Sequence, residues 1–87
     1  MEVFLVYGIS DCPACLRACA DLMERDKEYV FIEGDFSKSY REAIKNEFEW
    51  KTFPIIVRAD DSGEELVGGY NELLSLLQET PAATCTI

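Results

Sequence analysis

The sequence has 87 residues, of which 48% are hydrophobic and 11% aromatic, so it predicts one folded domain and excludes a disordered or low-complexity chain. Its net charge of −9, with 17 acidic residues against 8 scattered basic ones, argues against binding to nucleic acid or to anionic membrane surfaces. The apolar start of the chain lacks the basic region and cleavage site of a signal peptide, and no run reaches the length of a membrane span, so we expect a cytoplasmic location.

The first half of the chain predicts two strands, each followed by a helix. Residues 2–7 are apolar without alternation, which is typical of a central strand covered on both faces. A helix is expected from about residue 13 to residue 25, because a proline suits its first turn. A second strand is expected over residues 28–33. A second helix is expected over residues 38–48, with Ser37 as its N-cap.

The second half predicts a hairpin and a last helix. Strands are expected at residues 55–59 and 64–67, joined by an Asp-Asp-Ser-Gly turn, and Asn71 is expected to cap the final helix. The order β-α-β-α-β-β-α makes the first two strands parallel and the last two antiparallel. The predicted fold is therefore α/β, a mixed four-stranded sheet with helices on both faces. We place the domain at residues 1–80 and a loosely ordered tail at 81–87.

A Cys-x-x-Cys pair stands directly after the first strand and opens the first helix. In that context, Cys12 and Cys15 predict a redox-active dithiol. The free N–H groups and the positive end of the helix dipole favour a thiolate at Cys12, and Cys15 lies one turn further on. The neighbouring carboxylate of Asp11 would raise the thiol pKa. We expect the helix terminus, with help from Lys51, to outweigh it and to hold the pKa below about 8.5.

The two remaining cysteines leave alternatives open. Cys19 shares one helical surface with Cys12 and Cys15, so we expect it to be turned inward and inert; if it were exposed, it would suit a regulatory disulfide or glutathionylation. Cys85 is expected to be an exposed tail thiol without a catalytic role. Four thiolates also admit a zinc-binding module as a rival from another class. A redox-inactive adaptor is the third hypothesis.

Three motifs, in order, resemble those of glutaredoxins. Cys-Pro-Ala-Cys at 12–15 is similar to the family's Cys-Pro-Tyr-Cys. Thr-Phe-Pro at 52–54 is similar to its Thr-Val-Pro, in which the proline is cis, and Gly-Gly-Tyr-Asn-Glu-Leu at 68–73 resembles its Gly-Gly-x-x-Asp-Leu. The resemblance covers roughly residues 3–78. It implies a thioredoxin-like fold and a glutathione-dependent thiol–disulfide oxidoreductase.

The resemblance also implies a site. Cys12 and Cys15 would be catalytic. The residues implied to bind glutathione are Lys51, Thr52, Phe53, Pro54, Gly69, Tyr70 and Asn71. In this assignment the backbone of Phe53 pairs with an extended substrate. The N–H groups of Tyr70 and Asn71 hold the γ-glutamyl carboxylate, and Lys51 meets the glycine carboxylate. The alternatives are that Thr-Phe-Pro merely starts a strand, that the glycines form a bulge and that the lysine is solvated.

Two positions depart from the family pattern. Where glutaredoxins commonly carry a lysine before the first cysteine, this sequence has Ile9, and the tyrosine between the cysteines is Ala14. The reductant is therefore either glutathione or a flavin-dependent thioredoxin reductase. Disulfide-containing proteins are the expected partners, with ribonucleotide reductase as a family-derived candidate, in electron transport and cell redox homeostasis. A monomer without metal is expected, because Pro13 and Cys15 make an iron–sulfur cluster bridged by glutathione less favourable.

Overall fold

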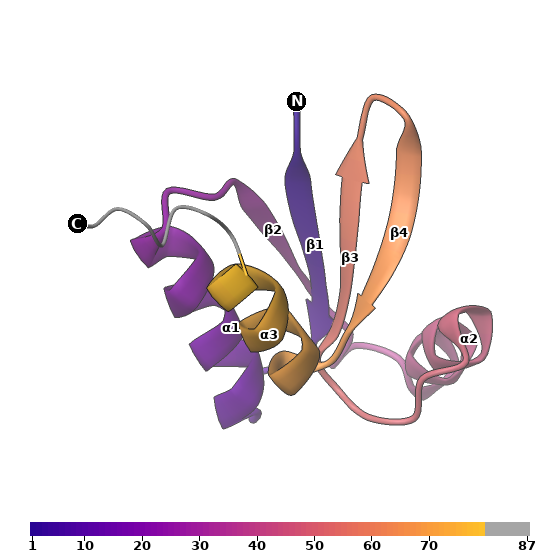
Figure 1. Ribbon diagram of the computed structural model, residues 1–87. Helices are drawn as coiled ribbons and strands as arrows, with labels where there is room; N and C mark the ends of the chain where they lie inside the picture. Colours follow the sequence, from indigo (N-terminus) through magenta and orange to yellow (C-terminus); the bar gives the residue numbers. More distant parts are fainter. Residues whose placement is uncertain (80–87) are drawn as a thin grey trace.

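Seven elements follow one another in the expected order in the computed structural model, which describes residues 1–79 (Figure 1). The strands are β1 (Val3–Gly8), β2 (Tyr29–Glu33), β3 (Ile55–Asp60) and β4 (Gly63–Gly68). The helices are α1 (Pro13–Glu24), α2 (Lys38–Phe48) and α3 (Tyr70–Glu79). Among these residues no helix has both the length and the apolar character needed to cross a bilayer.

The four strands form one mixed sheet in the order β2-β1-β3-β4. β1 pairs with β2 in parallel and with β3 antiparallel, and β3 pairs with β4 antiparallel. The parallel crossover and the antiparallel hairpin were both predicted, as was the interior position of the first strand. The register of β3 and β4 shifts between Ile56 and Val57, where the edge strand approaches its glycine end.

Helices cover both faces of the sheet, which confirms the predicted layers. Phe4 and Val6 of β1 point to the face covered by α1 and α3, which lie side by side (Figure 1), and both side chains are buried. Tyr7 points to the opposite face, where its ring centre lies 5.6 Å from that of Phe48 in α2. Of the apolar positions on α2, Ile44 alone is buried, so this helix covers its face more thinly than the other two helices cover theirs.

The hydrophobic core lies between the sheet and the helix pair. Alternate strand positions and the inward stripes of the two helices supply it, because these periodicities of two and 3.6 residues place the apolar side chains on facing surfaces. Its buried residues are Phe4, Val6, Ala18, Leu22, Ile56, Leu73 and Leu77. The core fixes the starts of α1 and α3 at the same end of the sheet.

The start of α3 differs from the prediction. Asn71 does not cap this helix, because Tyr70 is already helical and the carbonyl oxygen of Gly69 accepts the first helical hydrogen bond from the N–H of Leu73 at 3.0 Å. The N–H of Gly69 donates to Oε1 of Glu72 at 3.0 Å, as in one half of a capping box. Gly68 has a φ of 122°, so the chain turns into the helix two residues earlier than a cap at Asn71 would place it.

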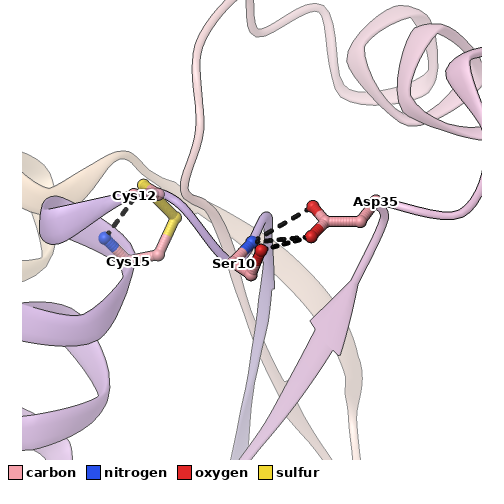
Figure 2. Close-up of a disulfide and its surroundings, with 4 residues drawn as sticks. All are labelled: Ser10, Cys12, Cys15 and Asp35. Atoms are coloured by element: carbon pink, nitrogen blue, oxygen red, sulfur yellow. Dashed lines mark hydrogen bonds between the residues drawn. A yellow bond between two sulfur atoms is a disulfide. The ribbon is translucent and has the colours of Figure 1, made fainter.

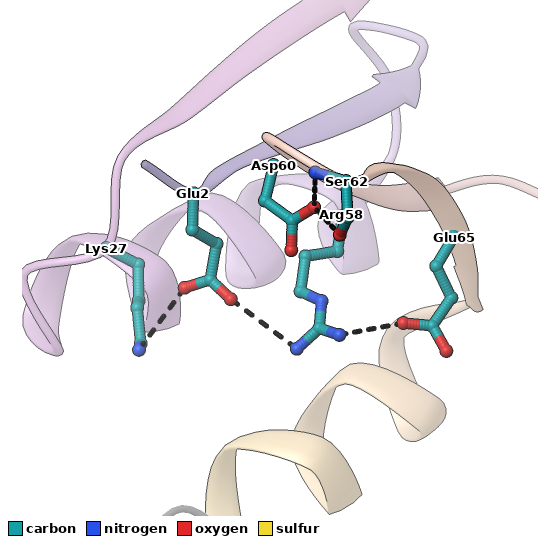
Figure 3. A network of polar contacts seen from close by, with 6 residues as sticks. All are labelled: Glu2, Lys27, Arg58, Asp60, Ser62 and Glu65. Carbon is teal, nitrogen blue, oxygen red and sulfur yellow. Dashed lines mark hydrogen bonds and ion pairs between the residues drawn. The ribbon is translucent and has the colours of Figure 1, made fainter.

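The other boundaries lie within a residue or two of those expected. α1 ends at Glu24 rather than at Arg25, whose N–H caps the helix by donating to carbonyls of the last turn. The predicted hairpin turn is present. The carboxylate Oδ1 of Asp60 accepts hydrogen bonds from the N–H of Ser62 at 2.9 Å and from its hydroxyl at 2.7 Å (Figure 3).

A chain of ion pairs crosses one end of the sheet (Figure 3). The Arg58 guanidinium lies 2.8 Å from the carboxylate of Glu65, its partner in the β3–β4 register, and 3.5 Å from that of Glu2. The Glu2 carboxylate lies 3.6 Å from the ammonium group of Lys27. All four side chains are partly or largely exposed, so each pair contributes at most about 1 kcal/mol. The network supports strand register rather than the site.

Candidate active site

The first helix begins at a cysteine. Cys12 is the N-cap of α1, with extended φ and ψ of −148° and 96°, and Pro13 follows as the first helical residue. The N–H of Cys15 donates to Sγ of Cys12 at 3.1 Å, and the N–H of Leu16 donates to its carbonyl oxygen at 3.2 Å. In the reduced protein the N–H of Cys15 and the helix dipole would stabilise a thiolate on Cys12.

Cys12 and Cys15 are joined by a disulfide, with their Cα atoms 5.3 Å apart (Figure 2). Cys12 is half-buried, whereas the side chain of Cys15 is fully buried. An incoming thiol or disulfide therefore reaches the sulfur of Cys12 first. This difference in exposure fits the predicted roles, in which Cys12 attacks and Cys15 resolves a mixed disulfide.

Gly8, at the end of β1, makes room for the buried cysteine. A methyl group at this position would lie 2.6 Å from Sγ of Cys15 and 2.9 Å from Cε1 of Phe31. The sequence pattern indicates only that a strand ends near this glycine. Its packing role depends on a contact between the strand and the helix that no local motif reveals.

The loop between β1 and α1 is tied to the loop that follows β2 (Figure 2). The carboxylate of Asp35 accepts hydrogen bonds from the backbone N–H of Ser10, at 3.1 and 3.3 Å, and from its hydroxyl. These bonds, with a smaller contribution from the Arg41 guanidinium, hold the pKa of Asp35 below its ordinary value of 3.8. This link orders the chain two residues before Cys12.

A cleft of about 360 Å³ lies beside the disulfide helix. It is lined by Ala14, Trp50, Thr52, Phe53, Pro54, Gly69, Tyr70, Asn71 and Glu72. The Phe53–Pro54 peptide bond is cis, as the resemblance implied. Six of the seven residues implied to bind glutathione thus meet at one cleft. Glu72 stands in the third motif, but no role was predicted for it. Trp50 was missed, because only the fold brings the beginning of the α2–β3 loop against the start of α3.

Lys51 is the seventh of those residues, and it does not line the cleft. It is exposed and lines a neighbouring groove of about 570 Å³, on which Trp50 also borders. Lys45 and the carboxylates of Glu42 and Glu49 line the same groove. The ammonium group of Lys45 lies 5.2 Å from the centre of the Phe53 ring, so this lysine contacts the cis-proline loop from its outer side.

The side chain of Tyr70 serves the packing of the helices. Its hydroxyl donates to Oδ2 of Asp21 at 2.7 Å and joins the start of α3 to the second half of α1. This hydrogen bond, with desolvation, raises the pKa of the Tyr70 phenol above its ordinary value of 10.0. The backbone N–H of Tyr70 is the group that the family resemblance implies as a donor to a ligand carboxylate.

Cys19 is half-buried against the core, and burial raises the pKa of its thiol above its ordinary value. A thiol with a raised pKa is a poor nucleophile at neutral pH, which supports the inert role expected for it. Cys85 lies outside the described residues. Within residues 1–79, no three His, Cys, Asp or Glu side chains are grouped as ligands for a metal ion.

Comparison with known proteins identifies the family of this chain. The family model described as Glutaredoxin matches residues 4–62, which include both cysteines and the cis-proline. The chain belongs to the glutaredoxin family. Members of this family are thiol–disulfide oxidoreductases, and the Cys12–Cys15 pair supplies that chemistry here. Membership favours the dithiol over the cysteine–zinc module and the inactive adaptor.

Solved glutaredoxins share the fold of this family member. The solution structure of glutaredoxin from Brucella melitensis matches with a TM-score of 0.68 and 23% identity, over 93% of this chain and 84% of that one. Glutaredoxin 1 from Francisella tularensis, crystallised with cacodylate, matches with a TM-score of 0.66 and 20% identity, over 91% and 95% of the two chains. A comparison with curated proteins found no significant match.

Proposed function

We propose that this glutaredoxin reduces protein disulfides and mixed disulfides with electrons from glutathione. The observation that carries the proposal is the position of the cleft, which places the cis-proline loop and the start of α3 beside the helix that Cys12 caps. Within residues 1–79 no backbone hydrogen bond involves Phe53, so its N–H and carbonyl are free to pair with an extended substrate.

The reductive half of the cycle uses both cysteines. The Cys12 thiolate attacks one sulfur of the substrate disulfide, and the other sulfur leaves as a thiolate that takes up a proton. Cys15 then loses its proton and attacks Sγ of Cys12. That attack releases the second substrate thiol and forms the Cys12–Cys15 disulfide, so two electrons have passed to the substrate.

Glutathione closes the cycle. One glutathione thiolate attacks Sγ of Cys12, forms a mixed disulfide and releases Cys15 as a thiol. A second glutathione attacks the sulfur of the bound glutathione. This attack yields oxidised glutathione and restores the Cys12 thiolate.

We propose a cytoplasmic setting, because a dithiol that donates electrons needs a reducing compartment. Ribonucleotide reductase is the candidate protein substrate, in electron transport and cell redox homeostasis, and the protein acts as a monomer.

A thioredoxin reductase is the second candidate donor. Ile9 and Ala14 occupy positions that commonly contact glutathione in the family, and no basic residue of the described chain lines the cleft. Both features weaken recognition of an anionic tripeptide without altering the dithiol chemistry.

NADPH consumption in the presence of glutathione, glutathione reductase and a low-molecular-weight disulfide tests the proposal, with Cys12→Ser as the blank. We expect turnover that vanishes in the variant. If the wild-type protein gives no turnover while dithiothreitol still reduces its disulfide, glutathione is not the donor. Turnover with thioredoxin reductase in its place would then support the second candidate.

A further inference from the structure

The edge strand β4 has one side without a neighbouring strand. It is the last strand in the order of the sheet, so it pairs with β3 on one side alone (Figure 1). In an antiparallel pair, every second residue of an edge strand directs its N–H and carbonyl groups away from the paired strand. Within residues 1–79, no backbone hydrogen bond outside the strand ladder involves β4. These outer groups are therefore available to pair with another extended chain.

A groove of about 330 Å³ follows this edge, between β4 and α3. The exposed fraction of Leu66 in its wall is 39%, and Val67 packs against the core behind it. Apolar, acidic and hydroxyl groups line the groove, from Arg58, Glu65, Leu66, Val67, Glu72, Ser75 and Leu76. Glu72 also lines the cleft beside the disulfide, so the groove and the cleft adjoin. A chain whose disulfide lies in the cleft can therefore continue into the groove.

The charge of this edge indicates which segment fits it. Residues 60–68 carry four carboxylates and no basic side chain. In the described part of the chain Arg58 is the base that lines the groove. Its guanidinium lies 2.8 Å from the carboxylate of Glu65 and 3.5 Å from that of Glu2, so its charge is compensated (Figure 3). A second copy of β4 would bring like charges together, whereas a segment with lysine or arginine meets opposite charges.

We propose that the groove between β4 and α3 binds an extended, basic segment of the protein substrate as an added strand. The backbone of this segment pairs with the outer groups of β4. Every second side chain points toward α3 and lies against Val67 and Leu76. Lysine or arginine side chains meet the exposed carboxylates of Glu64 and Glu65. The inference rests on the proposed function, because the segment belongs to the protein whose disulfide is reduced.

Binding without chemistry tests the groove itself. The probe is a cysteine-free peptide of alternating lysine and valine, blocked at both ends and titrated into the isotope-labelled protein. We expect the largest chemical-shift changes at the amides of β4, Ser75 and Leu76. The same peptide with every backbone nitrogen methylated keeps its charge but has no N–H to donate. It should bind at least about tenfold more weakly, because the hydrogen bonds to the edge strand are lost.

Two double variants separate a local surface from a general attraction. Glu64→Gln with Glu65→Gln should weaken binding of the unmethylated peptide about five- to tenfold, since two exposed ion pairs are lost. Glu24→Gln with Glu28→Gln removes two exposed carboxylates at the end of α1 and before β2. It is the matched control, because it changes the net charge by the same amount, and it should weaken binding by less than about twofold.

The same variants connect the groove to turnover. In a disulfide peptide that carries the lysine–valine segment beside its cysteine, KM should rise about fivefold in the Glu64/Glu65 variant while kcat stays the same. An unchanged KM overturns the inference. Equal binding of the methylated and unmethylated peptides, equal weakening in both double variants, or shift changes outside β4 and α3 overturn it as well.

Failure of the proposed function gives a different result. In that case no variant, the wild type included, reduces any disulfide peptide with glutathione. The titration with the cysteine-free peptide still reports whether the groove binds a basic strand.

Discussion

At Cys12, three local features act on one sulfur atom. The residue caps a helix, the N–H of Cys15 donates to its sulfur at 3.1 Å, and it is more exposed than its partner. The chain contains no histidine, so no imidazole is present to act as a general base. Activation of this thiol therefore depends on backbone groups and on the helix dipole.

The thiol pKa of Cys12 follows from that arrangement. In the Cys15→Ser variant, which leaves Cys12 as a free thiol at the helix start, we expect a pKa below the ordinary value of about 8.5. Thiolate absorbance near 240 nm, as a function of pH, measures it; the double variant lacking both cysteines is the blank. A pKa at or above the ordinary value would show that the Asp11 carboxylate outweighs the helix terminus.

Gly8 leaves the space that the buried side chain of Cys15 occupies. We expect Gly8→Ala to lower the free energy of unfolding by about 1–3 kcal/mol, because the new methyl group meets Sγ of Cys15 and a ring atom of Phe31 in a packed core. Thermal unfolding measures this loss. Mass spectrometry should also show more mixed disulfide between Cys12 and glutathione, because a displaced Cys15 closes the ring more slowly.

Gly34→Ala is the matched control for that experiment. Its methyl group would meet Cγ of the flexible Arg41 side chain at 3.2 Å, which moves aside more easily than a buried thiol. A loss of stability at Gly34 as large as that at Gly8 would contradict the packing argument.

At the scale of elements, much of the arrangement was predictable from the sequence. Local periodicity and the Cys-x-x-Cys context gave the order of strands and helices, and α2 has the predicted bounds. The start of α3 was not predictable from the capping preferences of single residues. β4 ends at Gly68 with a positive φ, and Gly69 instead of Asn71 is the residue that caps the helix. Tertiary geometry overrode the capping preference of asparagine.

The link between the two loops at the active-site end is an element-scale feature with a pH signature. Hydrogen bonds from Ser10 lower the folded-state pKa of Asp35 below 3.8. A lowered pKa means that this link stabilises the fold above the unfolded pKa. The contribution is lost as the pH falls through the folded value. Asp35→Asn should therefore lower Tm at pH 7, and the difference from wild type should shrink below about pH 4.

Asp60→Asn is the control, because Ser62 lowers the pKa of Asp60 in the same way at the distant hairpin. Both variants should show the pH-dependent loss of Tm. Only Asp35→Asn should slow the reaction of Cys12 with a small disulfide, by about two- to fivefold, since only that link orders the loop before the cysteine. Equal reactivity of Cys12 in both variants would limit Asp35 to a structural role.

At the scale of the whole molecule, the site is assembled from three distant segments. The motifs themselves were visible in the sequence, and the fold brings six of the seven implied ligand residues to one cleft. The place of Trp50 in the cleft and the separation of Lys51 from it were not predictable. They depend on how the α2–β3 loop packs against the start of α3, and no spacing along the chain encodes that contact.

The net charge of −9 is a property of the whole molecule, and it predicts a preference for substrates of opposite charge. A negative surface attracts basic disulfide peptides and repels acidic ones over a range set by the Debye length. With two peptides of equal length and an identical disulfide, we expect reduction of the lysine-flanked peptide to slow as salt rises from about 10 to 150 mM. Reduction of the glutamate-flanked peptide should accelerate. Equal salt slopes for the two peptides would mean that the charge serves solubility without steering substrates.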